Sequence, residues 1–292
     1  MIFILLGRIR PVRIVDAISA RVTRRLEMRS RRALRSFSAR LLLTIGSAGK
    51  VSEAMVMTGT KLSKTHSLYP SKGARAFATR VLEWYSDCGR HNLPWRKCER
   101  TEFELVVTEI LLQRTRAETV ASRFDEFFSR VRTWDDIIDI PYERLEEVLR
   151  PFGMWREKSR VLKSLASEMV KRGGVVPITV DEVRALPGVG HYIGAAICTI
   201  LHGKAEPMLD GNMARVIERH FGRREKADIR ADENLNRVAS EIISSGPPVQ
   251  LNWALLDHAT LVCKPRRPLC IGCPVRDTCV AYRKTPRERA RK

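Results

Sequence analysis

Four cysteines near the C-terminal end of the chain have the spacing of one metal centre. Six, two and five residues separate them, too short a stretch for comfortable separate disulfides: Cys263, Cys270, Cys273 and Cys279. Four thiolates so close together suit a tetrahedral metal centre. Zinc is the ordinary occupant in a basic protein, but a [4Fe–4S] cluster also takes four cysteines from a compact loop. The spacing leaves both open.

A glycine-rich turn, Leu-Pro-Gly-Val-Gly-His-Tyr at residues 186–192, could bind an anion. Thr179 and Glu182 have the spacing of a helix start before it, and apolar residues at helical spacing follow it. Glycines let a large anion approach backbone N–H groups at the amino end of the second helix. A hairpin whose glycines serve packing alone is the alternative. The residues expected to contact phosphate are Gly188, Val189, Gly190 and His191.

Positive charge favours a polyanionic partner. The 292 residues carry a net charge of +20, of which +9 falls in residues 1–60 and +11 in the rest. The body of the protein is therefore basic in its own right, as nucleic-acid-binding proteins are. Lys264, Arg266 and Arg267 lie between the first two clustered cysteines, where a metal centre would hold them on a stiff loop suited to a phosphate contact.

From residue 71 onward the sequence predicts short helices joined by tight loops. Thr101 with Glu104, and Thr115 with Glu118, have the spacing of capping boxes. No alternating strand pattern and no internal repeat is present, so we predict an all-α fold. Apolar residues at helical spacing indicate helices over about 77–85, 103–112, 120–128, 134–138, 145–149 and 155–171.

The order of the glycine turn, Asp210 and the Cys-x6-Cys-x2-Cys-x5-Cys run resembles the endonuclease III superfamily of helix-hairpin-helix DNA glycosylases. The resemblance covers about residues 71–282, and the cysteine spacing combined with the turn is highly specific. It implies a six-helix barrel domain over residues 100–206 that bears the hairpin, and a cluster domain over residues 71–99 and 207–282. It also implies a [4Fe–4S] cluster in place of zinc, and an active site in the cleft between the domains.

Two positions resemble the monofunctional mismatch branch of that family. The bifunctional branch has a Schiff-base lysine two residues after the last hairpin glycine, whereas this chain has Tyr192. A phenol forms no imine, so we expect no strand-cleaving lyase step. Glu109 lies in an apolar run, where a raised pKa would suit a general acid. A buried acid paired with an arginine or hydroxyl is the structural alternative.

The mechanism expected from this resemblance begins with a base flipped out of the duplex. Glu109 would protonate or hydrogen-bond the leaving base, Asp210 would stabilise the sugar cation and help activate water, and Tyr192 would orient these groups. Asp210 also suits the N-cap of a following helix. Gln113 and Arg114 match the place where the family inserts a side chain into the gap left by the flipped base.

Smaller differences from the adenine branch indicate which base is removed. The runs Leu-Pro-Trp-Arg at 93–96 and Asp-Gly-Asn at 210–212 resemble the adenine branch, but Arg114 replaces its usual glutamine and Met154 and Trp155 replace its two tyrosines. Adenine enzymes typically carry a further C-terminal domain, and this chain ends 13 residues after Cys279. We expect removal of thymine or uracil opposite guanine, with adenine opposite guanine or 8-oxoguanine as the alternative. A non-catalytic iron–sulfur DNA-binding module is the alternative of another class.

The two ends of the chain differ from its body. Residues 1–68 are basic and expected to be mostly disordered: a transit peptide, a DNA-binding arm or, slightly favoured, an extension upstream of a true start at Met55 or Met57. Residues 283–292 form a basic tail. No run reaches membrane-spanning length. We expect an intracellular monomer, in the cytoplasm or nucleoid or in an organelle if a transit peptide is present, acting on double-stranded DNA with a mispaired or damaged base.

Overall fold

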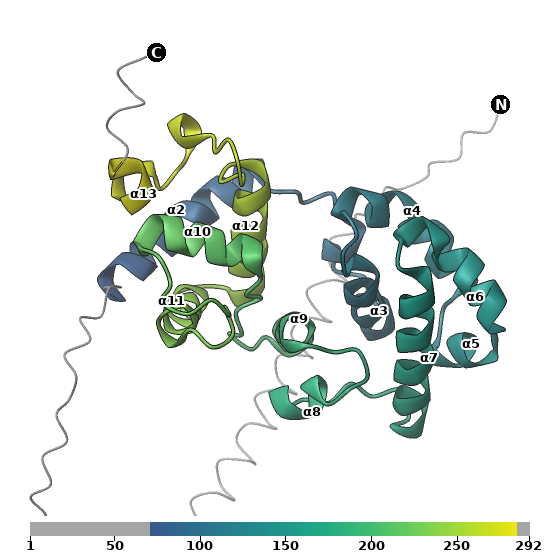
Figure 1. Cartoon of the computed structure of the whole chain (residues 1–292). Coiled ribbons are helices and arrows are strands. Elements are labelled where there is room, and N and C mark those ends of the chain that lie inside the picture. The colour runs from purple at the N-terminus through teal and green to yellow at the C-terminus, as the bar shows by residue number, and fades with distance from the viewer. Residues whose placement is uncertain (1–70, 285–292) are drawn as a thin grey trace, which may run out of the picture. The chain divides into compact units, whose positions relative to one another are not determined.

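The structure, a computed structural model, describes residues 71–284, and the predictions for residues 1–68 and for the tail beyond residue 284 lie outside them. The described residues are mostly helical and contain no β-strand, which confirms the all-α fold. The helices of Figure 1 are α2 (Ser71–Cys88), α3 (Glu102–Leu112), α4 (Ala117–Arg130), α5 (Trp134–Asp139), α6 (Tyr142–Leu149), α7 (Trp155–Lys171), α8 (Val180–Arg184), α9 (His191–His202), α10 (Gly211–Phe221), α11 (Glu233–Ile243), α12 (Pro248–Leu261) and α13 (Val280–Arg283).

The predicted capping box at the start of α3 is confirmed. The Thr101 hydroxyl accepts from the Glu104 amide at 3.1 Å, and the Glu104 carboxylate accepts from the Thr101 amide at 2.9 Å. Two of the donors that a helix start leaves unpaired are satisfied reciprocally. This fixes where α3 begins and therefore which of its residues face inward.

The predicted cap of α4 by Thr115 and Glu118 is wrong. The helix begins at Ala117, and no side chain caps it. The Thr115 hydroxyl instead donates to the Phe152 carbonyl at 2.5 Å and accepts from the amine of Lys158 at 2.6 Å. A tertiary contact has taken the hydroxyl that the local spacing assigned to the helix start.

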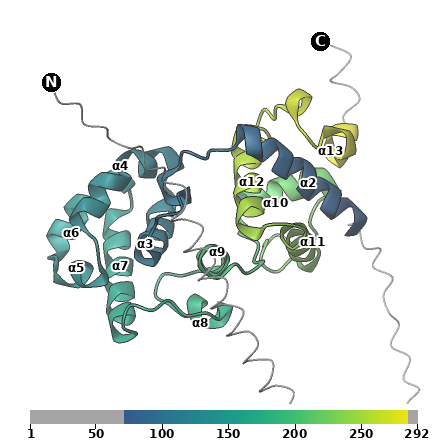
Figure 2. The ribbon, with the colours of Figure 1, turned by 180° about the vertical axis from the view of Figure 1, so that it is seen from behind.

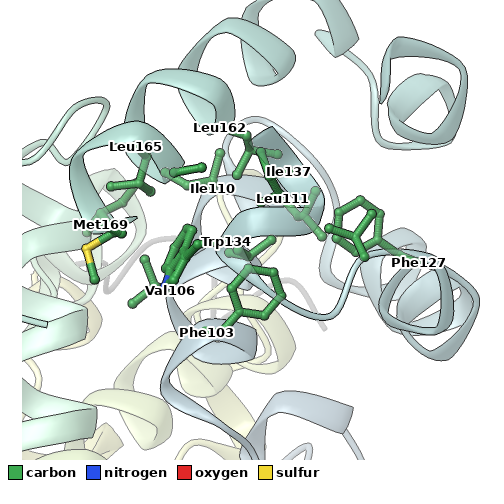
Figure 3. Packing of buried hydrophobic residues seen from close by; sticks show 14 of the residues in the cluster. Phe103, Val106, Ile110, Leu111, Phe127, Trp134, Ile137, Leu162, Leu165 and Met169 are labelled. Atoms are coloured by element: carbon green, nitrogen blue, oxygen red, sulfur yellow. The ribbon is translucent and has the colours of Figure 1, made fainter. Parts of the chain in front are cut away.

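A first core forms among α3, α4, α5, α6 and α7, part of which Figure 3 shows. Phe103 of α3 meets Trp134 of α5 edge to face, with ring centroids 4.8 Å apart, an arrangement that aromatic pairs prefer. The core also takes in Leu93 and Trp95, so it begins before the predicted domain boundary at residue 100. Other members labelled in Figure 3 are Val106, Ile110, Leu111, Phe127, Ile137, Leu162, Leu165 and Met169.

A second core joins the beginning and the end of the described chain. Helix α2 packs against α11 and α12, and α10 packs against α12; Figure 2 shows α2 lying along this group from behind. Phe77 and Val81 of α2 are buried there with Leu235 of α11 and Leu255 of α12. Residues more than 150 positions apart in the sequence thus share one apolar interior.

The predicted helix hairpin is present as α8, a glycine turn and α9. Gly188 has φ +75°, and a Cβ there would come within 2.2 Å of Cγ1 of Val161. Only glycine meets both demands without strain. Helix α9 contributes Ile193 and Ile197 to the first core and Ala196 to the second. The hairpin's second helix therefore runs where the two cores meet.

Candidate active site

A pocket of about 330 Å³ brings the three predicted catalytic residues together. Glu109 reaches it from α3, Tyr192 from the first turn of α9, and Asp210 from the residue before α10. Tyr192 lies close enough to both acids for their negative charges to raise the pKa of its phenol. Three segments distant in sequence thus supply one constellation of two acids and a phenol.

Glu109 is the buried acid of this pocket, with only 7% of its surface exposed. Within residues 71–284, its Oε2 atom has no hydrogen-bond partner. Burial raises the pKa of the Glu109 carboxyl to about 7, against the opposing charge of Arg96. At neutral pH a large fraction of Glu109 therefore carries a proton that it can give to a bound group.

Tyr192 stays a neutral hydrogen-bonding phenol. Burial raises its pKa well above the ordinary value, and the negative charges of Glu109 and Asp210 raise it further. A neutral phenol can donate a hydrogen bond but offers no amine for covalent attack.

Asp210 serves as the N-cap of α10, as its position in the sequence predicts. Its Oδ1 accepts from the backbone amides of Asn212 at 2.9 Å and Met213 at 2.8 Å, and its Oδ2 accepts from the Asn212 side chain at 2.8 Å. These bonds fix the carboxylate at the positive end of the helix. The Asp210 side chain thus caps α10 and also lines the pocket.

An ion-pair network beside Glu109 escaped the sequence analysis. Asp257 of α12 is fully buried and accepts from Nη1 and Nη2 of Arg96 at 2.7 and 3.0 Å. Arg90 donates to the same carboxylate through its Nε at 2.8 Å and through its backbone amide at 2.7 Å. Burial alone would raise the pKa of Asp257, but these arginine contacts hold it below its usual value. The network joins the segment before α3 to α12.

Arg96 lines the pocket. Both of its terminal nitrogens bind Asp257, while its buried Nε has no partner among residues 71–284. Its guanidinium lies 5.1 Å from the ring of Trp253, which also lines the pocket. The signal for this network was present in the sequence, because Asp257 interrupts an apolar run in α12.

Hydrogen bonds also run from the pocket to the clustered cysteines. The Asn212 side chain that donates to Asp210 accepts from Nη1 of Arg215 at 3.0 Å. Arg215 then donates through Nε to the Cys263 carbonyl at 3.1 Å and through Nη2 to the Ala259 carbonyl at 2.9 Å. One arginine thus braces both the side chain that binds the Asp210 carboxylate and the loop of the first cysteine.

If Asp210 takes part in a reaction in this pocket, we expect Arg215→Met to slow that reaction by about tenfold, the effect of losing roughly 1.5 kcal/mol of charged hydrogen bonding. The Asp210 carboxylate then loses the brace behind Asn212. Single-turnover rates measure this, with Arg230→Met as the control, since Arg230 is an exposed arginine paired with Asp228. Equal rates for Arg215→Met and the control would show that the brace has no catalytic effect.

Comparison with known proteins places this geometry in a family. Residues 107–241 match the family described as HhH-GPD superfamily base excision DNA repair protein. The thymine/uracil-DNA glycosylase of Pyrobaculum aerophilum is 33% identical over 216 residues, which cover 72% of this chain and 94% of that enzyme. The chain belongs to the HhH-GPD superfamily. The predicted family and the prediction of a DNA N-glycosylase are confirmed.

Two further similarities extend the comparison. A solved structure described as a thermostable thymine-DNA glycosylase superposes with a TM-score of 0.66 at 31% identity, covering 73% of this chain and 98% of that one. The human adenine DNA glycosylase is 28% identical over 243 residues, 80% of this chain. This chain spans 44% of the length of that human enzyme.

The residues expected at the DNA gap lie at the mouth of the pocket. Gln113 ends α3 and donates from Nε2 to the Gly188 carbonyl at 3.3 Å, which ties the pocket to the hairpin turn. Arg114 is exposed, lines the pocket and has a left-handed backbone with φ 53°. The structure thus brings these two residues together with the hairpin.

The hairpin turn presents the amino end of α9. Gly190 is the N-cap residue, and nothing lies within 4 Å of a Cβ built there. His191 begins the helix, and burial together with the charge of Arg184 lowers its pKa. Val189 is buried and its amide donates to the Leu186 carbonyl at 3.1 Å, so Val189 positions the turn. The remaining amides of the first turn lack helical acceptors and can meet an anion.

All four clustered cysteines line a cavity of about 770 Å³. Burial and, to a lesser extent, the neighbouring cysteines raise the pKa of the Cys273 thiol to about 11. Arg219 donates to the Lys264 and Pro265 carbonyls at 2.7 and 2.6 Å and so holds the loop. Lys264, Arg266 and Arg267 are exposed on that loop. Among residues 71–284, no three His, Cys, Asp or Glu side chains converge on a position for one metal ion.

Among residues 71–284, no helix is long and apolar enough to cross a membrane.

Proposed function

We propose that the protein is a monofunctional DNA glycosylase that removes thymine or uracil opposite guanine from double-stranded DNA. The meeting of Glu109, Tyr192 and Asp210 in one pocket carries the proposal, because it supplies a protonated acid, a neutral phenol and a carboxylate at one place. Tyr192 stands where the bifunctional branch has its Schiff-base lysine. We therefore propose that hydrolysis proceeds without a covalent imine and without strand cleavage.

The reaction follows from these groups. The flipped base enters the pocket, and its bond to the sugar breaks with both electrons going to the base. Glu109 gives its proton to the leaving base, while the Asp210 carboxylate stabilises the positive charge on the sugar. Water then forms the new C–O bond on the sugar and releases one proton, which returns Glu109 to its acid form. Tyr192 donates a hydrogen bond that orients the reacting groups.

The choice of base is supported by similarity. The thymine/uracil enzyme named above matches this chain over 94% of its own length. The alternative, adenine opposite guanine or 8-oxoguanine, is favoured by the similarity to the human adenine enzyme, which is 28% identical over 243 residues.

The deciding experiment is base release by the purified protein from duplexes with T/G, U/G, A/G and A/8-oxoguanine pairs, each assayed with and without alkali. We expect release of thymine or uracil, with strand breaks only after alkali. Release of adenine alone would establish the alternative. Strand breaks without alkali would contradict the monofunctional mechanism, and no release from any duplex would contradict the glycosylase itself.

We also propose that the four cysteines hold a [4Fe–4S] cluster. All four cysteines line one cavity, as the ligands of one shared metal group would, and their Cys-x6-Cys-x2-Cys-x5-Cys spacing resembles that of the family's cluster. When bound, the cluster would link the four cysteines and fix their loop. We also propose two domains: a barrel over residues 100–206, to whose core Leu93 and Trp95 contribute as well, and a cluster domain over residues 71–99 and 207–282.

Removal of a cluster cysteine should release the metal. We expect the wild type to contain about four iron atoms and four acid-labile sulfides per chain, and Cys273→Ala to lose most of both. Cys98→Ala is the control, since Cys98 is an exposed free cysteine outside the cavity. Zinc in place of iron in the wild type, or full iron in Cys273→Ala, would overturn the assignment.

A further inference from the structure

Lys158 is a buried lysine that pairs with no carboxylate of residues 71–284. Only 2% of its surface is exposed, and its Nζ donates to the Thr115 hydroxyl at 2.6 Å and to the Phe152 and Gly153 carbonyls at 2.8 and 3.2 Å. All three acceptors are neutral. Burial lowers the pKa of Lys158 to about 8. A charge is rarely buried among neutral acceptors, so this lysine has a task that an apolar side chain would not perform.

The lysine joins the two places where the backbone is strained. Within residues 71–284, only Arg114 and Met154 have positive φ without being glycine, at 53° and 48°. Arg114 directly precedes Thr115, and Met154 directly follows Gly153, both partners of Lys158. Such conformations are costly and persist only where the surroundings enforce them. Three hydrogen bonds from one amine supply that enforcement on both loops at once.

Both strained residues present their side chains outward. Arg114 is exposed and lines the mouth of the pocket. Met154 is a large apolar residue that exposes 42% of its surface. A guanidinium plane and an exposed apolar side chain are the two kinds of group that can enter a base stack. Thr115 ties them together, because its hydroxyl also donates to the Phe152 carbonyl.

We infer that Lys158 is a positioning residue that holds Arg114 and Met154 as a rigid pair against the DNA stack when the target base leaves it. The inference rests on the proposed glycosylase function and deepens it. Lys158 does not line the pocket, so it acts through the two loops and not on the bond that breaks. Its loss would let both loops relax and would weaken base extrusion, while the groups of the pocket would remain.

The test compares two substrates in single-turnover reactions, using whichever base the wild type releases best. In one duplex the base is mispaired, and in the other it is unpaired in a single-nucleotide bulge, where extrusion is easier. We expect Lys158→Met to slow release from the mispair by at least about tenfold and release from the bulge by much less, since extrusion of a paired base takes the larger free energy. Thr115→Val should act in the same direction, more weakly.

Lys163→Met is the matched control. Lys163 lies on the same helix α7, and its amine donates to the Ile138 and Ile140 carbonyls, away from the pocket. Equal slowing on both substrates by Lys158→Met, or a loss no larger than that of the control, would overturn the inference. If Lys158→Met fails to fold, Thr115→Val takes its place in the test, and the slowing on the mispair is again compared with the slowing on the bulge. A wild type that releases no base from any duplex would instead refute the proposed function.

Discussion

Glu109→Gln is expected to reduce base release by at least about 100-fold, the usual contribution of a general acid. The amide keeps the size of the carboxyl and its place on α3 but has no proton of suitable acidity. Single-turnover release from the best substrate measures the effect. DNA binding, measured separately on the same duplex, should change little, which distinguishes a chemical defect from a lost interface.

The pH dependence of the wild type gives an independent check. Because the pKa of Glu109 is about 7, its protonated form predominates below pH 7 and declines above it. The rate of bond breaking should therefore fall as pH rises through about 7, and this limb should be absent from the residual rate of Glu109→Gln. A rate that rises through the same range would identify Glu109 as a base rather than an acid.

The same substitution should stabilise the protein at alkaline pH. Folding raises the pKa of Glu109 from 4.5 to about 7, so the unfolded chain ionises first and the folded state loses stability between these values. Above pH 7 the loss is complete, about 3 kcal/mol. Glu109→Gln removes it and should raise the free energy of unfolding at pH 8 by up to that amount, with little change near pH 4.

Chemical denaturation at both pH values measures this difference. Glu126→Gln on α4 is the control, since Glu126 is exposed and forms ion pairs with Arg123 and Arg130. A destabilised Glu109→Gln protein at pH 8 would mean that an ionised Glu109 has a structural partner, the alternative reading of this residue from the sequence.

Asp257→Asn is expected to give the largest loss of stability, about 3–5 kcal/mol, the usual consequence of breaking a buried ion pair from one side. The Arg96 guanidinium, whose side chain is 5% exposed, would keep its charge without the carboxylate that now binds two of its nitrogens. The amide nitrogen of asparagine would also face arginine donors. Urea denaturation at pH 7 measures the change in the free energy of unfolding.

This substitution should also reach the active site. The charge of Arg96 already lowers the pKa of Glu109, and Asp257 partly neutralises that charge. Without Asp257 the pKa of Glu109 should fall further, and the alkaline limb of the rate profile should move to lower pH. Asp228→Asn, an exposed carboxylate paired with Arg230, is the control for both measurements. An alkaline limb at the same pH as in the wild type would show that Asp257 does not influence the pKa of Glu109.

Local sequence patterns predicted much of the structure. Trp155 was expected to begin a helix that ends at residue 171, and α7 has those bounds. Asp210 was expected to cap the next helix and does so. Such features depend on neighbours a few positions away, which a sequence displays directly. Glu109 could be placed by the same means, because a carboxyl inside an apolar run of a helix must be buried.

Contacts between distant residues were not predictable in this way. Arg96 and Asp257 are 161 positions apart, and no local pattern in either segment indicates that the two side chains pair. Thr115 matched the pattern of a helix cap, but the amine of Lys158, 43 positions away, took its hydroxyl. Spacing reports what a side chain can do locally, whereas the fold decides which competing partner it meets.

The pairing of α2 with α11 and α12 has a consequence for biosynthesis. Helix α2 leaves the ribosome early but packs against helices that are made late, so the second core cannot close before residue 261 has emerged. The first core draws on residues from Leu93 to Cys198 and is complete by then. The four clustered cysteines emerge after α12. On a growing chain, the cluster proposed for them would therefore bind only after the first core has formed.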